Sequence, residues 1–158
     1  MTAERTKPSR LLHWFFRLPI GIYRARLGWL FGHRLLMLTH VGRKSGLVRR
    51  TVLEVVGRDR SADEFFVVAG YGPTSDWYRN ALANPPLAVD VAARRFVPRV
   101  RELTEPQRRE LLENYLAVHP RAAAALGERL LGMPFRGEED LPRAAAELPA
   151  LGLSPDKG

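Results

Sequence analysis

The chain contains no cysteine among its 158 residues. Without cysteine there is no disulfide framework, no thiolate nucleophile and no zinc or iron–sulfur cluster bound by thiolates. The four histidines are scattered without the spacing of metal ligands, so we expect no metal site. These absences exclude several classes of enzyme and agree with a cytoplasmic protein.

Long apolar runs are also missing. The apolar residues are dense between residues 11 and 38, but Arg17, Arg24, Arg26 and Arg34 interrupt them. No stretch approaches the roughly 20 clean apolar residues of a membrane span. The N-terminus lacks the basic region, apolar core and cleavage site of a secretory signal. We therefore expect a protein that is neither exported nor transmembrane.

Acidic residues are the minority charge. The chain has 25 Lys and Arg residues against 17 Asp and Glu residues, a formal net charge of +8. Such a surface attracts anions, which leaves a phosphorylated cofactor, a nucleic acid or an acidic membrane as partner classes. No nucleic-acid motif and no basic strand with interleaved aromatics is present, so we expect no nucleic-acid partner.

The length and composition fit one globular domain over residues 1–158, with 46% hydrophobic and 27% charged residues. The pattern predicts an α+β architecture in three parts. Residues 1–34 form a helical segment, residues 35–103 form the β core with one inserted helix, and residues 104–158 form C-terminal helices and a tail. About five or six antiparallel strands are expected.

The N-terminal segment is predicted as two short helices broken at Pro19. Arg10, Arg17 and Arg24 recur every seven residues and share one edge of a helical path, with aromatic and aliphatic residues elsewhere. Two interpretations remain open. The segment packs over one end of the β core, or it lies on an anionic membrane as a peripheral helix.

Three strands are predicted first, over residues 35–40, 50–56 and 64–69, from their apolar and β-branched content. The polar residues 57–61 between the second and third strands are typical of a short hairpin loop. We therefore expect the second and third strands to be antiparallel neighbours.

An inserted helix follows over residues 77–83. Hydroxyl and carboxyl side chains at residues 74–76 offer N-caps, and the Asn-Pro-Pro run at 84–86 ends the helix. A second hairpin is predicted from residues 87–91 and 95–100, which alternate in polarity. Within the predicted strand over residues 95–100, Pro98 indicates an edge strand or a bulge.

The rest of the chain is predicted to be mainly helical. Residues 104–106 open a helix with a capping threonine and an early proline, and His119-Pro120 ends it. A further Ala-rich helix is expected over residues 121–131. The proline-containing tail is expected to be weakly ordered apart from residues 138–148.

The sharpest local motif is a basic turn at residues 42–46. Gly42 and Gly46 bracket Arg43, Lys44 and Ser45 between two predicted strands. Glycines let the backbone present several N–H groups, the two cations add charge, and the serine adds a neutral donor. The pattern suits a phosphate group. An exposed basic hairpin loop is the alternative.

A second motif covers residues 77–85. Trp77 and Tyr78 begin it, followed by Asn80, Leu82 and Asn84. On a helix the aromatic and apolar residues would pack into the core, and Asn80 and Asn84 would cap the helix end.

In this order and separation, the two motifs resemble the deazaflavin-dependent nitroreductase family. The resemblance covers about residues 36–103. The matching residues are Gly42, Arg43, Lys44, Ser45, Gly46, Arg49, Thr51, Trp77, Tyr78, Asn80, Ala83, Asn84 and Pro85. It implies a split β-barrel of the FMN-binding type and the deazaflavin coenzyme F(420) as cofactor.

The resemblance also implies a cofactor site. Arg43, Lys44 and Ser45 would hold the phosphate of the coenzyme, and the end of the third strand with the following loop would border its tricyclic ring. The implied cofactor-binding residues are Gly42, Arg43, Lys44, Ser45, Gly46, Arg49, Thr51, Ala69, Gly70, Gly72, Trp77 and Tyr78.

The implied activity is hydride transfer from the reduced coenzyme to a small organic acceptor such as a quinone, a nitro compound or an activated double bond. Tyr71 and Tyr78 are the candidate catalytic donors of a proton or a hydrogen bond, with packing as the alternative role for each. FMN as the cofactor and a non-catalytic coenzyme-binding protein are the two alternatives.

Overall fold

The computed structural model describes residues 32–121 and 137–158. The predicted N-terminal helices, with their possible role at a membrane, lie outside these residues, and so does the predicted Ala-rich helix beyond Arg121. Among the residues described, no helix has both the length and the continuous apolar character that crossing a bilayer requires.

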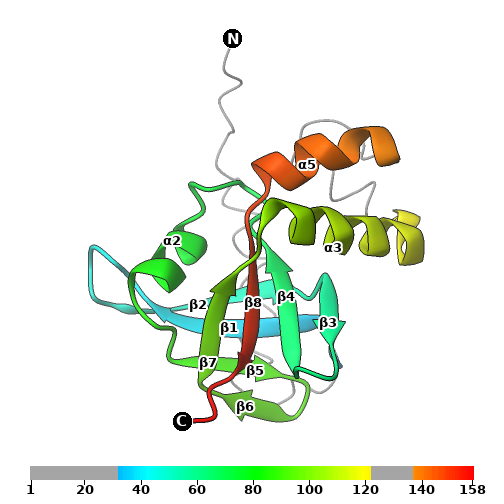
Figure 1. Cartoon of the computed structure of the whole chain (residues 1–158). Helices are drawn as coiled ribbons and strands as arrows, with labels where there is room; N and C mark the ends of the chain where they lie inside the picture. The colour runs from blue at the N-terminus through cyan, green and yellow to red at the C-terminus, as the bar shows by residue number, and fades with distance from the viewer. Residues whose placement is uncertain (1–31, 122–136) are drawn as a thin grey trace.

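Two four-stranded antiparallel sheets form the centre of an α+β fold (Figure 1). Sheet A has the strand order β2-β1-β5-β6, and sheet B has the order β3-β4-β8-β7. The strands are β1 (Leu35–Val41), β2 (Val48–Glu54), β3 (Gly57–Asp59), β4 (Glu64–Val68), β5 (Ala88–Val91), β6 (Arg94–Phe96), β7 (Pro98–Glu102) and β8 (Ala150–Pro155). Within the described residues the sheets remain separate and do not close into a barrel.

The main core lies between the two sheets and follows the two-residue period of the strands. On β4, Phe65 and Val67 face this core, and on β8 Leu151 and Leu153 do the same. All four are fully buried, and burying each such side chain stabilises the fold by about 1.5–3 kcal/mol. The shared core therefore holds the two sheets together.

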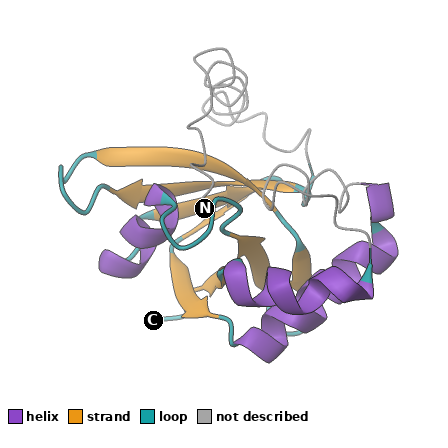
Figure 2. Ribbon diagram, turned by 90° about the horizontal axis from the view of Figure 1, so that it is seen from above, coloured by secondary structure: helices purple, strands orange, loops and turns teal. Residues whose placement is uncertain are grey.

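A second core lies on the outer face of sheet B, where Phe66 and Val68 of β4 point. Helices α3 (Glu105–Val118) and α5 (Leu141–Glu147) cover it, and the short 3₁₀ helix η2 (Glu138–Asp140) leads into α5. Figure 2 shows α3 and α5 side by side below the sheets. A capping box at Thr104 fixes the start of α3, as its sequence predicts.

Helix α2 (Asp76–Ala83) is the inserted helix, and it lies against β1 near the turn that joins β1 to β2 (Figure 1). It begins after Ser75 and ends at Asn84, directly before the two prolines. This placement brings the two sequence motifs next to each other.

The prediction of a weakly ordered tail is wrong at its end. Residues Ala150–Pro155 form β8, which pairs with β4 on one side and β7 on the other. The two flanking prolines made this segment look like a loop. Pro155 occupies the last position of the strand, however, and Leu151 and Leu153 supply the alternating apolar side chains that the core requires.

Two strand pairings also differ from the predictions. The second and third predicted strands, β2 and β4, belong to different sheets, and the predicted loop residues 57–59 form β3, which pairs with β4 instead. The predicted strand over residues 95–100 divides into β6 in sheet A and β7 in sheet B. Pro98 begins β7, an edge strand, as predicted.

Candidate cofactor site

The basic turn joins β1 to β2 and is closed by its own backbone. Gly42 N–H donates to the Leu47 carbonyl and Gly46 N–H donates to the Gly42 carbonyl, both at 2.8 Å. Gly46 has φ of +68°, a conformation that glycine adopts at little cost. Gly46 therefore provides the bend of the turn, whereas Gly42 leaves space for the Ser45 side chain.

Ser45 lies folded against the start of the turn. A Cβ atom on residue 42 would lie 2.5 Å from Ser45 Oγ, so only glycine fits there without displacing the hydroxyl. Ser45 Oγ accepts a hydrogen bond from Leu47 N–H at 3.2 Å. Because the oxygen acts as acceptor in this bond, the hydroxyl hydrogen is left to donate elsewhere.

Arg43 ties the turn to α2. Its backbone N–H donates to Asn80 Oδ1 at 3.0 Å, and its Nη1 donates to the same oxygen at 2.9 Å. Both terminal nitrogens also lie 3.2 Å from Asp76 Oδ1. The guanidinium is thus engaged by the helix, which makes Arg43 an anchor of the turn.

A buried polar pair continues inward from Asn80. Asn80 Nδ2 lies 3.3 Å from His40 Nδ1, and His40 Nε2 lies 3.0 Å from Thr51 Oγ1. His40 and Asn80 are both buried, and Thr51 is half-buried. Burial and, to a smaller extent, the charge of Arg49 lower the pKa of His40 to about 4, so the imidazole is neutral at pH 7.

Three cations around the turn have no such engagement. The side chains of Lys44, Arg49 and Arg50 are exposed, and none forms a hydrogen bond or ion pair with any residue in 32–121 or 137–158. Residues 42–50 include no Asp or Glu. Since Asp76 is already paired with Arg43, the positive charge of these three side chains is available to an external anion.

The loop between β4 and α2 holds the next group of predicted site residues. Ala69 is fully buried and its N–H donates to the Pro149 carbonyl, while Gly70 is half-buried. Gly72 has φ of +79° and donates back to the Ala69 carbonyl at 2.9 Å, which makes a tight turn. Tyr71, at the tip of this turn, is 45% exposed.

Trp77 and Tyr78 face different neighbours. Trp77 is half-buried and packs against the core between the sheets. The Tyr78 hydroxyl donates to Glu102 Oε1 on β7 at 2.8 Å, and burial together with this bond raises the pKa of Tyr78 to about 12. The structure therefore brings the basic turn and α2 together but directs the Tyr78 hydroxyl toward sheet B.

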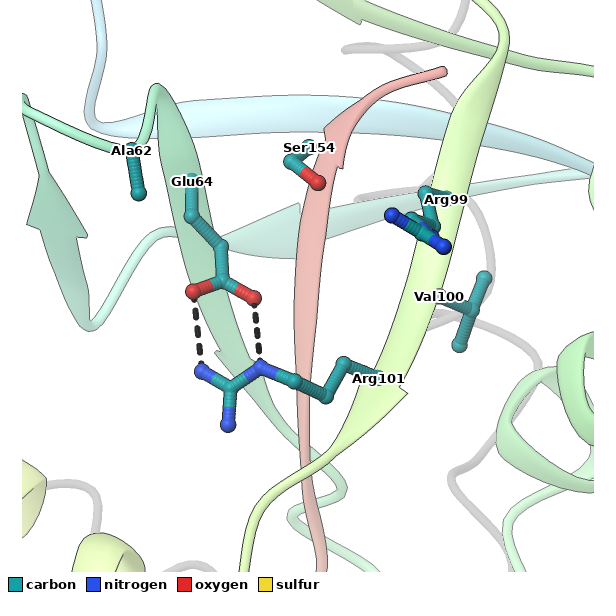
Figure 3. Close-up of a pocket in the computed structure, with 6 residues that line it drawn as sticks. All are labelled: Ala62, Glu64, Arg99, Val100, Arg101 and Ser154. Atoms are coloured by element: carbon teal, nitrogen blue, oxygen red, sulfur yellow. Dashed lines mark hydrogen bonds and ion pairs between the residues drawn. The ribbon is translucent and has the colours of Figure 1, made fainter. Parts of the chain in front are cut away.

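A separate pocket of about 410 Å³ lies on the uncovered part of the outer face of sheet B (Figure 3). Its lining residues are Ala62, Glu64, Arg99, Val100, Arg101 and Ser154. Glu64 and Arg101 face each other across β8 in a two-point ion pair, with N–O distances of 3.0 and 2.8 Å. None of the predicted site residues lines this pocket.

Sequence reasoning missed the roles of Asn80 and His40. It treated Asn80 as a capping group and His40 as a member of a strand, whereas the structure joins them beneath the basic turn. The partners of Asn80, Arg43 and His40, lie 37 and 40 residues away from it in sequence. The only local signal was an asparagine in the middle of a helix, a position that this residue seldom favours.

The sequence profile of the F420H(2)-dependent quinone reductase family matches residues 15–131 of the chain. No curated protein matches the chain significantly. Among solved structures, the F420-H2 Dependent Reductase FDR-A is similar, with 21% identity, coverage of 78% of this chain and 96% of that chain, and a TM-score of 0.51.

Two further structures share the fold. A pyridoxamine 5'-phosphate oxidase-related, FMN binding protein from Nostoc punctiforme PCC 73102 has 12% identity and a TM-score of 0.53, and the match covers 95% of this chain and 81% of that chain. A domain-swapped dimer has 19% identity and a TM-score of 0.51, with coverage of 86% and 99%. At these identities the likeness concerns the fold.

Proposed function

Because the chain belongs to the F420H(2)-dependent quinone reductase family, we propose that its basic turn and α2 together form the site that holds the phosphate of the coenzyme. The family membership makes the protein an oxidoreductase whose hydride donor is the reduced deazaflavin coenzyme F(420). The assignment of individual residues to this site is our proposal.

The observation that carries the proposal is the contrast within the turn. Arg43 is engaged by Asp76 and Asn80 and holds the turn in place. Lys44 and Arg49 extend from this anchored turn and the adjacent strand with no acidic partner among the described residues. A fixed backbone with uncompensated cations fits a phosphate group.

Two hydroxyl groups complete the proposed phosphate site. Ser45 accepts from Leu47 N–H and Thr51 accepts from His40, so each has its own hydrogen left for a phosphate oxygen. Lys44 and Arg49 would supply charge, while Ser45 and Thr51 would supply neutral donors. Arg43 would act by fixing the turn.

The loop at residues 69–72 would border the ring of the coenzyme. Its tight turn at Gly72 presents Tyr71 at the surface, where its ring can pack over a flat ligand and its hydroxyl can serve as a hydrogen-bond donor. Tyr78 is a weak candidate donor, because Glu102 already accepts its hydrogen and its pKa is about 12. We assign Tyr78 to packing.

A quinone is the acceptor that we propose, since it is the substrate class of the family. When bound, the reduced coenzyme supplies the hydride. The task of the chain is to hold donor and acceptor face to face and to exclude water. Nitro compounds and activated double bonds are the other acceptors that the same geometry would accommodate.

Absorbance and fluorescence titrations of the purified protein with F(420) and with FMN test the cofactor assignment. We expect saturable binding of F(420) and clearly weaker binding of FMN, followed by oxidation of reduced F(420) when a quinone is added. Saturable binding of FMN alone, or no turnover with any quinone, would contradict the proposal.

We also propose a split β-barrel of the FMN-binding type, in which sheets A and B are its two halves. The shared core between the sheets and the fold likeness to an FMN-binding protein support this.

For the cellular setting, we propose a cytoplasmic protein that meets anionic membranes through Arg10, Arg17 and Arg24. Co-sedimentation with anionic but not neutral vesicles tests this, with the triple Arg→Ala variant as control.

A further inference from the structure

Four polar side chains form a continuous chain beneath the basic turn: Arg43, Asn80, His40 and Thr51. We refer to them as the polar chain. It runs from the basic turn through the middle of α2 and the end of β1 to the middle of β2. Because each contact requires one donor and one acceptor, fixing the direction of one hydrogen bond fixes the others.

Arg43 sets the orientation of the Asn80 amide. Asn80 Oδ1 accepts two hydrogen bonds, from the Arg43 backbone N–H at 3.0 Å and from Arg43 Nη1 at 2.9 Å. The opposite orientation would point the amide hydrogens at two donors. The amide oxygen therefore faces Arg43, and Nδ2 with its hydrogens faces His40.

The Asn80 amide in turn selects the tautomer of His40. Because Asn80 Nδ2 is a donor, His40 Nδ1 must accept and carries no hydrogen. A neutral imidazole then carries its hydrogen on Nε2, which donates to Thr51 Oγ1 at 3.0 Å. The Thr51 oxygen is consequently an acceptor in this bond, and no described residue accepts the hydrogen of its own hydroxyl.

We propose that Asn80 and His40 are positioning residues that leave the Thr51 hydroxyl as a hydrogen-bond donor to a phosphate oxygen of the deazaflavin coenzyme. This inference rests on the proposed function. Thr51 lies two residues after Arg49 on β2, so their side chains share one face of the strand. The face also includes His40, which is paired with Arg49 in the β1–β2 ladder. An anion drawn by Arg49 would thus meet the Thr51 donor.

The tautomer can be measured without the coenzyme by nitrogen NMR of protein labelled with ¹⁵N-histidine. We expect His40 to show an unprotonated Nδ1 and a protonated Nε2 at pH 7. In Asn80→Asp the carboxylate still accepts from Arg43 but cannot donate, so we expect the His40 hydrogen on Nδ1. A protonated Nδ1 in the wild-type protein would overturn the proposal.

A double-mutant cycle tests whether His40 acts through Thr51. We expect Thr51→Val to weaken F(420) binding about tenfold and His40→Phe to weaken it about fivefold. If His40 acts only through the hydroxyl, His40→Phe should have no further effect in the Thr51→Val background. If the variants fold and the two effects multiply, the positioning role of His40 is overturned. The proposed function still stands in that case, provided that the wild-type protein binds F(420).

Conservative variants and a shortened ligand complete the test. Thr51→Ser retains the hydroxyl at residue 51, and His40→Gln retains a side-chain donor at residue 40. We expect both variants to bind F(420) within about threefold of wild type. His40→Gln also provides a folded variant where His40→Phe does not fold. We expect Thr51→Val to leave the affinity for the deazariboflavin that lacks the phosphate unchanged within about twofold. Equal weakening with both ligands would overturn the phosphate assignment.

Discussion

The end of sheet A at the basic turn and the open face of sheet B both concentrate charge, but they differ in how that charge is compensated. On sheet B, the Glu64 carboxylate is buried and paired at both oxygens with Arg101, and Arg101 also donates to Gln107. At the turn, Lys44 and Arg49 have no acidic partner among the described residues. The first arrangement has its charges paired within the protein, whereas the second leaves positive charge available to an external anion.

This comparison shows why net charge alone does not locate a site. A paired buried carboxylate and guanidinium contribute little attraction for other ions, because their charges cancel at short range. Exposed cations without an acidic partner create a positive potential in the surrounding solution, and this potential attracts anions. We therefore expect mutations at the two regions to separate stability from binding.

The largest effect is expected from the double variant Lys44→Ala/Arg49→Ala. Loss of two charge-assisted contacts should weaken F(420) binding by about 2–4 kcal/mol, or roughly 30- to 800-fold. The thermal midpoint should remain near that of wild type, since both side chains are exposed. Fluorescence titration and thermal melting measure the two quantities.

Arg95→Ala is the matched control for this variant. Arg95 is also an exposed arginine of sheet A, but it is paired with Asp90 on the neighbouring strand. We expect its removal to leave coenzyme affinity unchanged within about twofold. Equal losses in the control and in the double variant would mean that general charge, and not the turn, governs binding.

Acid should destabilise the fold through His40. The pKa of His40 is about 4 in the folded protein and about 6.5 in the unfolded chain. The unfolded state therefore takes up a proton first as the pH falls. The associated stability is present above pH 6.5 and is lost progressively toward pH 4, up to about 3 kcal/mol.

Urea unfolding of wild type and His40→Gln at pH values between 7 and 4.5 measures this contribution. We expect the wild-type free energy of unfolding to fall more steeply with decreasing pH than that of the variant. Parallel curves for the two proteins would show that His40 is not the titrating group. The difference between the two curves measures how much stability depends on a neutral His40 in the polar chain.

On sheet B, Gly152→Ala should act on stability alone. A Cβ atom at residue 152 would lie 2.6 Å from Glu64 Cδ, so the carboxylate would have to leave its place beside Arg101. We expect a loss of about 2 kcal/mol of stability. Coenzyme affinity of the folded variant should not change. A variant that melts like wild type but binds F(420) poorly would assign a ligand to this face instead.

A smaller effect is expected at the other end of β2. Tyr115 on α3 donates to Glu54 Oε1 at 2.6 Å, and burial and this bond raise the pKa of Tyr115. Tyr115→Phe removes the bond and should cost about 1 kcal/mol of stability with no change in binding. Chemical denaturation and titration test both statements. A binding defect would show that the two ends of β2 are coupled.

Local patterns predicted the helices of this fold better than its sheets. The structure confirms the predicted N-cap at Thr104 and the predicted end of α2 before the two prolines. Both signals are local, because capping depends on residues a few positions apart. The separation of β2 from β4 was not predictable, since a short polar loop looks the same whether the chain reverses within one sheet or crosses to another.

The arrangement of the candidate site was predictable only in part, for the same reason. The composition of the basic turn is visible in five consecutive residues, and the family resemblance implies Arg49 and Thr51 as cofactor-binding residues. The engagement of Arg43 by Asn80 depends on a contact across 37 residues. Only the three-dimensional structure distinguishes the cation that anchors the turn from the cations that remain available.

Strand β8 makes the order of synthesis important for folding. It fills the position between β4 and β7, where Leu153 pairs with Phe65 and Val100. Until residues 150–155 have left the ribosome, β4 and β7 each expose an unpaired edge, and unpaired edges recruit strands from other chains. The pairing of Phe65 with Leu153 also closes a long stretch of chain, and contacts between such distant residues form slowly because of their entropic cost. We therefore expect chains that stop before residue 150 to accumulate in aggregates, with the position of β8 occupied by neighbouring molecules.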